Sequence, residues 1–148
     1  MEKFIKVLIK TRKFLIIGKF SVVVLKLLGL EIPKKVIIGK NVKFNHLSTG
    51  LVIHPKTVIE DDVQIFQGVT IGRADAYQDY KFSEMEGIVI KRGAVLCAGS
   101  KILCKKGILT VGENTIVGAN SVLLNSTGDN EIWAGIPAKL QKSYQKKQ

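Results

Sequence analysis

The stretch from Gly50 to Gly72, GLVIHPKTVIEDDVQIFQGVTIG, places an isoleucine at every sixth position. A period of six is neither the 3.6 of a helix nor the 2 of a flat strand. It is typical of short strands joined by turns, in which each hexapeptide forms one side of a coil and like residues stack on like. The complete set of anchors is Ile38 and Phe44; Ile53, Ile59, Ile65 and Ile71; Ile90, Leu96 and Ile102; and Val111, Val117 and Leu123.

A second position supports the same period, because a small or branched residue stands four places after most anchors. These residues are Thr57, Val63, Val69, Ala94, Ser100, Thr115 and Ser121. Glycine directly follows other anchors, at Gly39, Gly72, Gly112 and Gly118, where we expect tight turns that use its conformational freedom. The repeat therefore predicts an all-β solenoid, a parallel β-helix of hexapeptide repeats over residues 31–138.

The repeat is interrupted at residues 73–87, RADAYQDYKFSEMEG, by charged and aromatic residues. We predict a loop that is extruded from one coil. Long loops in compact domains are more often functional than decorative. The alternative is a solvated insertion that covers a neighbouring subunit. A shorter break surrounds Lys105–Gly107.

The formal net charge of +11 is concentrated at the two ends of the chain. Residues 1–43 carry eleven Lys and Arg against two Glu, and residues 139–148, a basic C-terminal tail, carry four Lys. No basic face interleaved with aromatic residues is visible, so the sequence does not favour nucleic-acid binding. Two cysteines, Cys97 and Cys104, match no zinc spacing, and we expect no metal and a reducing, cytoplasmic setting.

Residues 1–30 are both apolar and basic, and we expect them to form an amphipathic helical segment. Lys3, Lys6, Lys10 and Lys13 fall on one side of a helix. The uncharged runs are far shorter than the roughly 20 residues of a membrane span, and no signal-peptide cleavage site follows them. Two interpretations remain open. The segment packs on its own domain or a neighbouring subunit, or it lies peripherally on the anionic surface of the inner membrane.

The chain has two histidines, His46 and His54. His46 lies in FNHLSTG, where the six-residue phase is lost, so we expect an exposed and oriented side chain. An imidazole there can take a proton from a hydroxyl group; the alternative is a hydrogen-bonded structural histidine. For His54, which follows an anchor, we expect an exposed turn residue. No nucleophile elbow or reactive-cysteine context is present, which favours direct transfer over a covalent intermediate.

The quoted stretch, with the later hexapeptides and the ending WAGIPAK at residues 133–139, resembles the serine acetyltransferase branch of the hexapeptide-repeat acyltransferases. Within that branch it looks most like the short bacterial polysaccharide and sugar O-acetyltransferases. The resemblance runs from about Glu31 to Lys139. It implies a left-handed coil, acetyl-CoA as co-substrate, no metal, and a homotrimer whose CoA groove lies between adjacent subunits.

The resemblance also implies roles for particular residues. Residues 31–46, EIPKKVIIGKNVKFNH, match a family segment that runs from an acid to the catalytic histidine. His46 is then the general base, and Glu31 holds it in one tautomer and balances its charge. The residues matched to the acyl-CoA groove are Ala98, Ala119, Gly135, Pro137 and Lys139.

Two departures from serine acetyltransferases bear on the acceptor. Asn45 replaces an aspartate before the catalytic histidine, and Met85–Gly87 lacks a histidine that grips the amino-acid carboxylate in that family. Tyr77 and Tyr80 offer flat faces that suit sugar rings. We therefore expect acetyl transfer to a sugar or polysaccharide hydroxyl, with serine O-acetylation as the alternative.

Two other classes are disfavoured. A carbonic anhydrase of this fold needs three histidine ligands, and the chain has two histidines. A catalytically silent scaffold would not need Glu31 and His46 at matching spacing.

Overall fold

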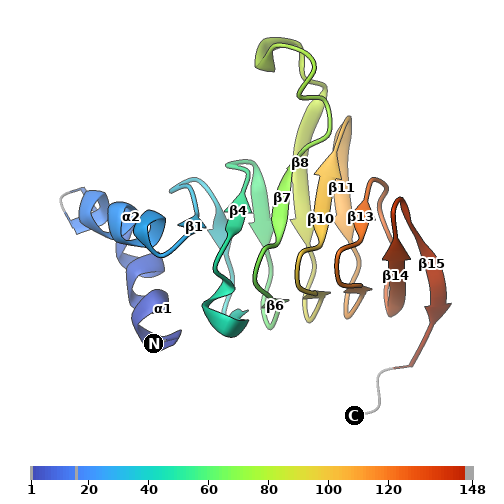
Figure 1. Cartoon of the computed structure of the whole chain (residues 1–148), viewed down its shortest axis with the longest axis horizontal. Coiled ribbons are helices and arrows are strands. Elements are labelled where there is room, and N and C mark those ends of the chain that lie inside the picture. Colours follow the sequence, from blue (N-terminus) through green and yellow to red (C-terminus); the bar gives the residue numbers. More distant parts are fainter. Residues whose placement is uncertain (1, 16, 146–148) are drawn as a thin grey trace.

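The computed structural model describes residues 2–15 and 17–145, and it forms a three-sided parallel β-helix preceded by two helices (Figure 1). The helices lie at the end of the β-helix where the first coil begins, and strands of successive coils stack along its axis. No helix in the described part of the chain is long and apolar enough to cross a membrane. The elements are α1 (Glu2–Thr11), α2 (Ile17–Leu27), β1 (Leu30–Glu31), β2 (Ile37–Ile38), β3 (Lys43–Phe44), η1 (Asn45–Ser48), β4 (Leu51–Ile53), β5 (Thr57–Ile59), β6 (Gln64–Ile65), β7 (Thr70–Arg73), η2 (Tyr80–Phe82), β8 (Met85–Ile90), β9 (Val95–Leu96), β10 (Lys101–Cys104), β11 (Gly107–Val111), β12 (Ile116–Val117), β13 (Val122–Leu123), β14 (Glu131–Gly135) and β15 (Ala138–Ser143).

Three sheets form the three faces. Sheet A has the order β1-β4-β7-β10-β13, sheet B has the order β11-β8-β5-β2, and sheet C has the order β15-β14-β12-β9-β6-β3. The described strands pair in parallel, except that β15 returns antiparallel to β14. Residues 139–143 of the expected basic tail therefore belong to a strand, whereas residues 146–148 lie outside the described residues.

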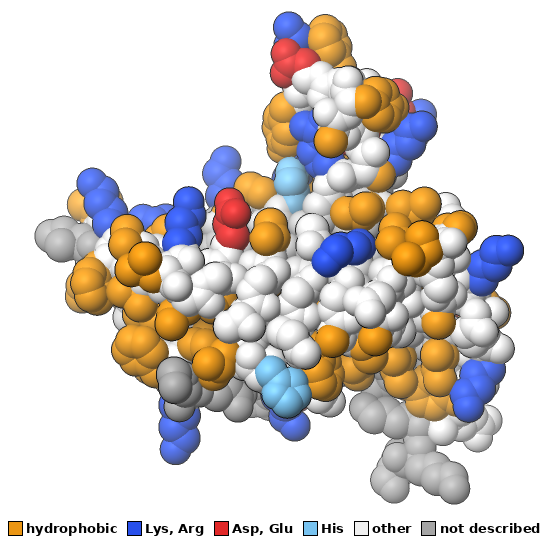
Figure 2. Space-filling model, in the orientation of Figure 1, with side chains coloured by type: hydrophobic (Ala, Val, Ile, Leu, Met, Phe, Trp, Pro, Cys, Tyr) orange, Lys and Arg blue, Asp and Glu red, His pale blue; other side chains and the backbone are white. Residues whose placement is uncertain are grey.

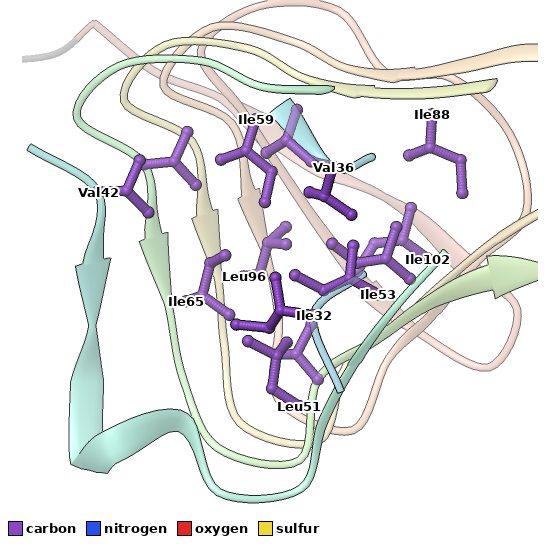
Figure 3. Packing of buried hydrophobic residues seen from close by; sticks show 14 of the residues in the cluster. Ile32, Val36, Val42, Leu51, Ile53, Ile59, Ile65, Ile88, Leu96 and Ile102 are labelled. Atoms are coloured by element: carbon purple, nitrogen blue, oxygen red, sulfur yellow. The ribbon is translucent and has the colours of Figure 1, made fainter. Parts of the chain in front are cut away.

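The six-residue anchors form the core, as the sequence predicts. From Phe44 to Leu123 each anchor is buried, and the small residues four places later are buried as well. The register stacks anchors on one another: in sheet A, Ile53 pairs with Ile71, Ile71 with Ile102, and Ile102 with Leu123. Figure 3 shows Ile53, Ile59, Ile65, Leu96 and Ile102 directed into the interior of the coil. Burial of this continuous apolar column is the main driving force for the fold.

Tight turns directly follow Gly39, Gly112 and Gly118, as expected, but φ is not positive at these glycines or at Gly72. The left-handed corner positions are held by other residues, among them Gly68 (φ +69°) and Gly99 (φ +71°). Gly112 is needed for a different reason, because a Cβ atom there would lie 1.9 Å from the carbonyl oxygen of Gly128. The repeat places glycine where neighbouring coils approach closely as well as where the backbone turns.

The interruption at residues 73–87 contains an extruded loop that is shorter than expected, because Arg73 belongs to β7 and residues 85–87 belong to β8. β7 ends at Arg73 and β8 begins at Met85, so residues 74–84 project from the corner between sheets A and B. Figure 1 shows this loop standing well away from the coils.

The glycine positions give a paired stability test. Gly68→Ala places a Cβ on a left-handed backbone and should lower the free energy of unfolding by about 1 kcal/mol. Gly72→Ala is the matched control, since φ at Gly72 is not positive and the added Cβ meets only Leu103 at 3.9 Å. Urea denaturation of the two variants measures the difference. Equal losses of stability would contradict this assignment of the corner positions.

Candidate active site

His46 lies on a strained corner that connects β3 to β4. Three consecutive residues, His46, Leu47 and Ser48, have φ values of 49°, 60° and 47°. Non-glycine residues in this region each cost about 1–3 kcal/mol, and such strain concentrates at functional sites. The buried Ser48 hydroxyl donates a hydrogen bond to the Ile65 carbonyl oxygen (2.8 Å) and so ties the corner to the next coil. The corner fixes the backbone that carries the exposed His46 side chain.

The surroundings of the imidazole are open. Its ring centroid lies 6.0 Å from that of Phe66 on the next coil. Within residues 2–15 and 17–145, the structure gives the His46 ring no hydrogen-bond partner. The neighbouring Asn45 side-chain amide donates to Gln64 Oε1 over 3.4 Å. The role of His46 as a general base stays a prediction.

A column of corners runs from His46 along the edge between sheets C and A. Backbone amides of successive coils join them: Gly68 donates to Thr49 O (2.8 Å), Gly99 to Gln67 O (2.9 Å) and Asn120 to Ala98 O (2.9 Å). Ala98 is half-buried and Ala119 is exposed at this edge, and Gly135 follows at its far end, where β14 stops. We call the residues at positions 45–50, 66–68, 97–99, 118–120 and 133–135 the corner column. His46, the predicted base, and Ala98 and Ala119, which were predicted to contact the cofactor, therefore lie along the same edge.

Glu31 lies on the outer face of sheet A, exposed, in register with Val52 of β4. Among the described residues its carboxylate makes no hydrogen bond or ion pair, and none joins it to His46. The two side chains belong to the same coil, one at its first strand and the other at its last corner. Their predicted partnership in catalysis stays a prediction.

Sequence reasoning missed one residue of the corner column, Gln67, and one residue that hydrogen-bonds to the column, Lys101. Gln67 has a buried Oε1 atom that accepts no hydrogen bond in the part of the chain that the structure describes. Lys101, on β10, donates from Nζ to the Gly68 carbonyl oxygen (2.7 Å). Both are polar residues at outward positions of otherwise regular hexapeptides, and the sequence pattern does not distinguish such residues from a solvated surface.

The extruded loop is attached at a different edge, between sheets A and B. His54 is half-buried there rather than exposed as expected, because the Tyr80 ring stacks on it with centroids 6.0 Å apart. The Arg73 guanidinium lies 4.9 Å from the centre of the same ring. Within one chain, Tyr77 and Tyr80 therefore lie on a different edge from His46. Figure 2 shows the two histidines, in pale blue, well apart on this face, one of them beneath the loop.

A buried ion pair holds the base of the loop. The fully buried Asp75 carboxylate accepts hydrogen bonds from Arg73 Nε (2.7 Å) and Gln78 Nε2 (3.0 Å). Hydrogen bonds from the Ser83 hydroxyl, Arg73 and Gln78 hold the pKa of Asp75 far below its usual range. The loop has a fixed anchor even though its tip is exposed.

Neither cysteine is poised for catalysis. Burial raises the pKa of the Cys97 thiol, which lies in the corner column, and burial also raises the pKa of Cys104. A neutral thiol is a poor nucleophile. Over the described residues, no three His, Cys, Asp or Glu side chains gather where they could hold a metal ion.

Comparisons with known proteins assign the type of fold. The chain is 37% identical over 103 residues to the serine acetyltransferase of Haemophilus influenzae, which covers 70% of this chain and 35% of that protein. It is 32% identical over 135 residues to the serine acetyltransferase of Staphylococcus xylosus, covering 91% of this chain and 58% of that one. A solved serine acetyltransferase in complex with CoA superposes with a TM-score of 0.71 at 30% identity, covering 95% of this chain and 57% of the other.

This chain has the hexapeptide-repeat β-helix fold of solved serine acetyltransferases. The solved relatives have the left-handed coil, which confirms the handedness that the resemblance implied. The relatives are serine acetyltransferases rather than sugar or polysaccharide O-acetyltransferases, so the expected closeness to the sugar enzymes is not supported. The chain spans 35% and 58% of the length of the two relatives described. No protein-family model matches it.

The environment of His54 predicts a measurable titration of its imidazole. Burial, and then the charges of Lys56 and Arg73, lower the pKa of His54 in the folded protein. Because the unfolded chain binds this proton more readily, His54 should reduce stability as pH falls from about 6.5 through the folded-state value. Removing the covering ring with Tyr80→Ala should raise the pKa of His54, measured by NMR titration of the imidazole. An unchanged pKa would show that the ring does not shield it.

Proposed function

We propose that the chain is an O-acetyltransferase that uses acetyl-CoA as donor and transfers the acetyl group directly to a hydroxyl. The observation that carries this proposal is the corner column, in which an exposed, strained histidine stands at one end of an edge lined by small residues. The CoA bound to a solved relative supports the choice of donor.

In the proposed reaction, the His46 imidazole accepts the proton of the acceptor hydroxyl as the oxygen attacks the thioester carbonyl carbon. The carbon–sulfur bond then breaks, the acetyl ester remains on the acceptor, and the CoA sulfur takes the proton from the imidazolium. Glu31 would orient and charge-balance the imidazole in the assembled site. The raised thiol pKa values of Cys97 and Cys104 favour this direct route over an acyl-cysteine.

Ala98, Ala119 and Gly135 would border the extended pantetheine chain, because small side chains leave room along the edge. Pro137 and Lys139 lie beyond the column, at the turn between β14 and β15 and the start of β15, where the exposed Lys139 ammonium suits a phosphate.

We propose a homotrimer with shared sites, and the separation of the two edges supports this assembly. One chain leaves the His46 corner without a second wall, and its loop with Tyr77 and Tyr80 lies on another edge. In a symmetric ring, the corner column of one copy and the loop of the next can face a common cleft. The other possible role of the loop is to seal the contact between subunits.

For the acceptor, similarity to serine acetyltransferases favours serine over a sugar. One observation favours a neutral acceptor as the second candidate. Asn45 and Gln64 form a neutral amide pair beside His46, where serine acetyltransferases carry an aspartate. A site without the negative charge of an aspartate attracts the ammonium group of serine more weakly.

Replacing His46 tests the mechanism. His46→Ala should bind CoA normally but lose transfer by on the order of 10²–10⁴-fold, the usual contribution of a positioned base. His54→Ala, the matched control, should lose far less kcat than His46→Ala, because the His54 ring packs against Tyr80 and is not the proposed acceptor of the hydroxyl proton. Glu31→Gln should lose less activity than His46→Ala. Near-full turnover by His46→Ala, measured as release of the CoA thiol, would exclude His46 as the base.

The acceptor is tested by thiol release from acetyl-CoA against serine, monosaccharides, nucleotide sugars and oligosaccharides. We expect turnover with serine, and Asn45→Asp should raise kcat/KM for serine because the carboxylate attracts its ammonium group. A neutral sugar serves as the control acceptor for that variant, since it should gain nothing. Turnover with a carbohydrate and none with serine would instead establish the second candidate.

A further inference from the structure

The two N-terminal helices expose an unusually apolar surface. In α2, Ile17, Phe20, Val23 and Leu27 recur every three or four residues along one side of the helix, and they are exposed. The fractional exposure reaches 68% for Phe20 and 82% for Leu27. We call α1 and α2, with the described residues between them, the hairpin. We call the exposed large apolar residues of the hairpin the apolar face: Phe4, Val7, Phe14, Leu15, Ile17, Phe20, Val23 and Leu27.

This face is not the one that packs on the β-helix. Ile5, Leu8 and Ile9 of α1 and Leu25 of α2 are buried in the common core. The helices therefore have two apolar sides, and only one is used within the chain. The interpretation that the N-terminal segment packs on its own domain is confirmed for the buried side and leaves the apolar face unexplained.

The hairpin is held in a fixed position. The buried Arg12 guanidinium donates hydrogen bonds to the carbonyl oxygens of Ile9, Pro33 (3.4 Å) and Val36 (2.8 Å), which ties α1 to the first coil. Thr11 and Ser21 hydroxyls are hydrogen-bonded over 2.8 Å between the helices. At Gly18, a Cβ atom would lie 2.4 Å from the Arg12 carbonyl oxygen, so the helices are in close contact. The apolar face is therefore preformed.

The hairpin that carries the apolar face is strongly basic. The exposed lysines of the hairpin are Lys3, Lys10, Lys13, Lys19 and Lys26, and no acidic residue occurs from Lys3 to Leu30. Figure 2 shows orange apolar side chains gathered with blue basic ones over the helices at this end of the molecule. Large apolar side chains with a lysine border suit an interface that is apolar inside and anionic at its surface.

We propose that the apolar face inserts into the surface of an anionic membrane, with the lysines contacting lipid phosphates. Pairing of two identical faces from two copies is less favourable, because a two-fold contact would bring two lysine borders together with no acidic residue to balance them. The face lies at the helical end of the β-helix, so attachment there leaves the extruded loop clear of the helices.

Vesicle flotation of the full chain tests the proposal. The protein should float with vesicles that contain phosphatidylglycerol, float poorly with phosphatidylcholine alone, and be released by added salt. Phe20→Asp should weaken the partition by about tenfold or more, because an exposed apolar contact is replaced by an anion. Lys19→Glu should weaken it by at least about fivefold.

The matched controls carry the same substitutions outside the hairpin. Ile108→Asp, at an exposed apolar position of β11, and Lys142→Glu, on β15, should leave flotation unchanged. Light scattering of each variant reports its oligomeric state. The proposal would be overturned if the full chain did not float with phosphatidylglycerol vesicles, or if the control variants lost as much flotation as Phe20→Asp and Lys19→Glu. Phe20→Asp that dissociates the protein and leaves flotation unchanged would also overturn it and would identify the face as a contact between copies.

Discussion

The structure depends on the requirement that each coil stack in register on the next. Interior side chains such as Ile53, Ile71 and Ile102 fill the space between the three sheets only if every coil presents the same position to the axis. Backbone hydrogen bonds along the sheets impose the same registration. Any extra residues must therefore leave the coil at a corner, because an insertion within a strand would move the following anchors out of the core.

The requirement that coils stack in register also determines where the candidate active site lies. Both irregular segments, the strained turn at His46 and the loop after Arg73, occur at corners, where the stack tolerates extra or unusual residues. Corners of successive coils also lie above one another, so residues separated by a coil or more become neighbours in one column. In the proposed function, the rigid solenoid would align His46 with a long edge along which an extended acetyl-CoA would lie.

The unequal distribution of charge along the chain matches the division of the molecule into a β-helix and an N-terminal hairpin. The coils between residues 44 and 138 are close to neutral, with eight basic and ten acidic residues, whereas the hairpin is strongly basic. Arg12 uses its guanidinium to fix the hairpin to the first coil and is buried, so it adds to the anchor rather than to the surface. The hairpin is a rigid extension of the solenoid with a surface chemistry of its own.

The sequence by itself determined the period of six, the anchors and the extruded loop, because a one-dimensional repeat appears directly in residue order. It also marked His46 through the loss of phase. It could not show which corner each irregular residue occupies, and so did not place Tyr80 over His54 or separate the loop from His46. The sequence also could not show why a given glycine is needed. Gly68 occupies a corner with a left-handed backbone, whereas Gly112 lies where two coils approach closely. The two apolar sides of the N-terminal hairpin were likewise decided only by tertiary packing, because helical periodicity shows which residues share a side but not which side the fold covers.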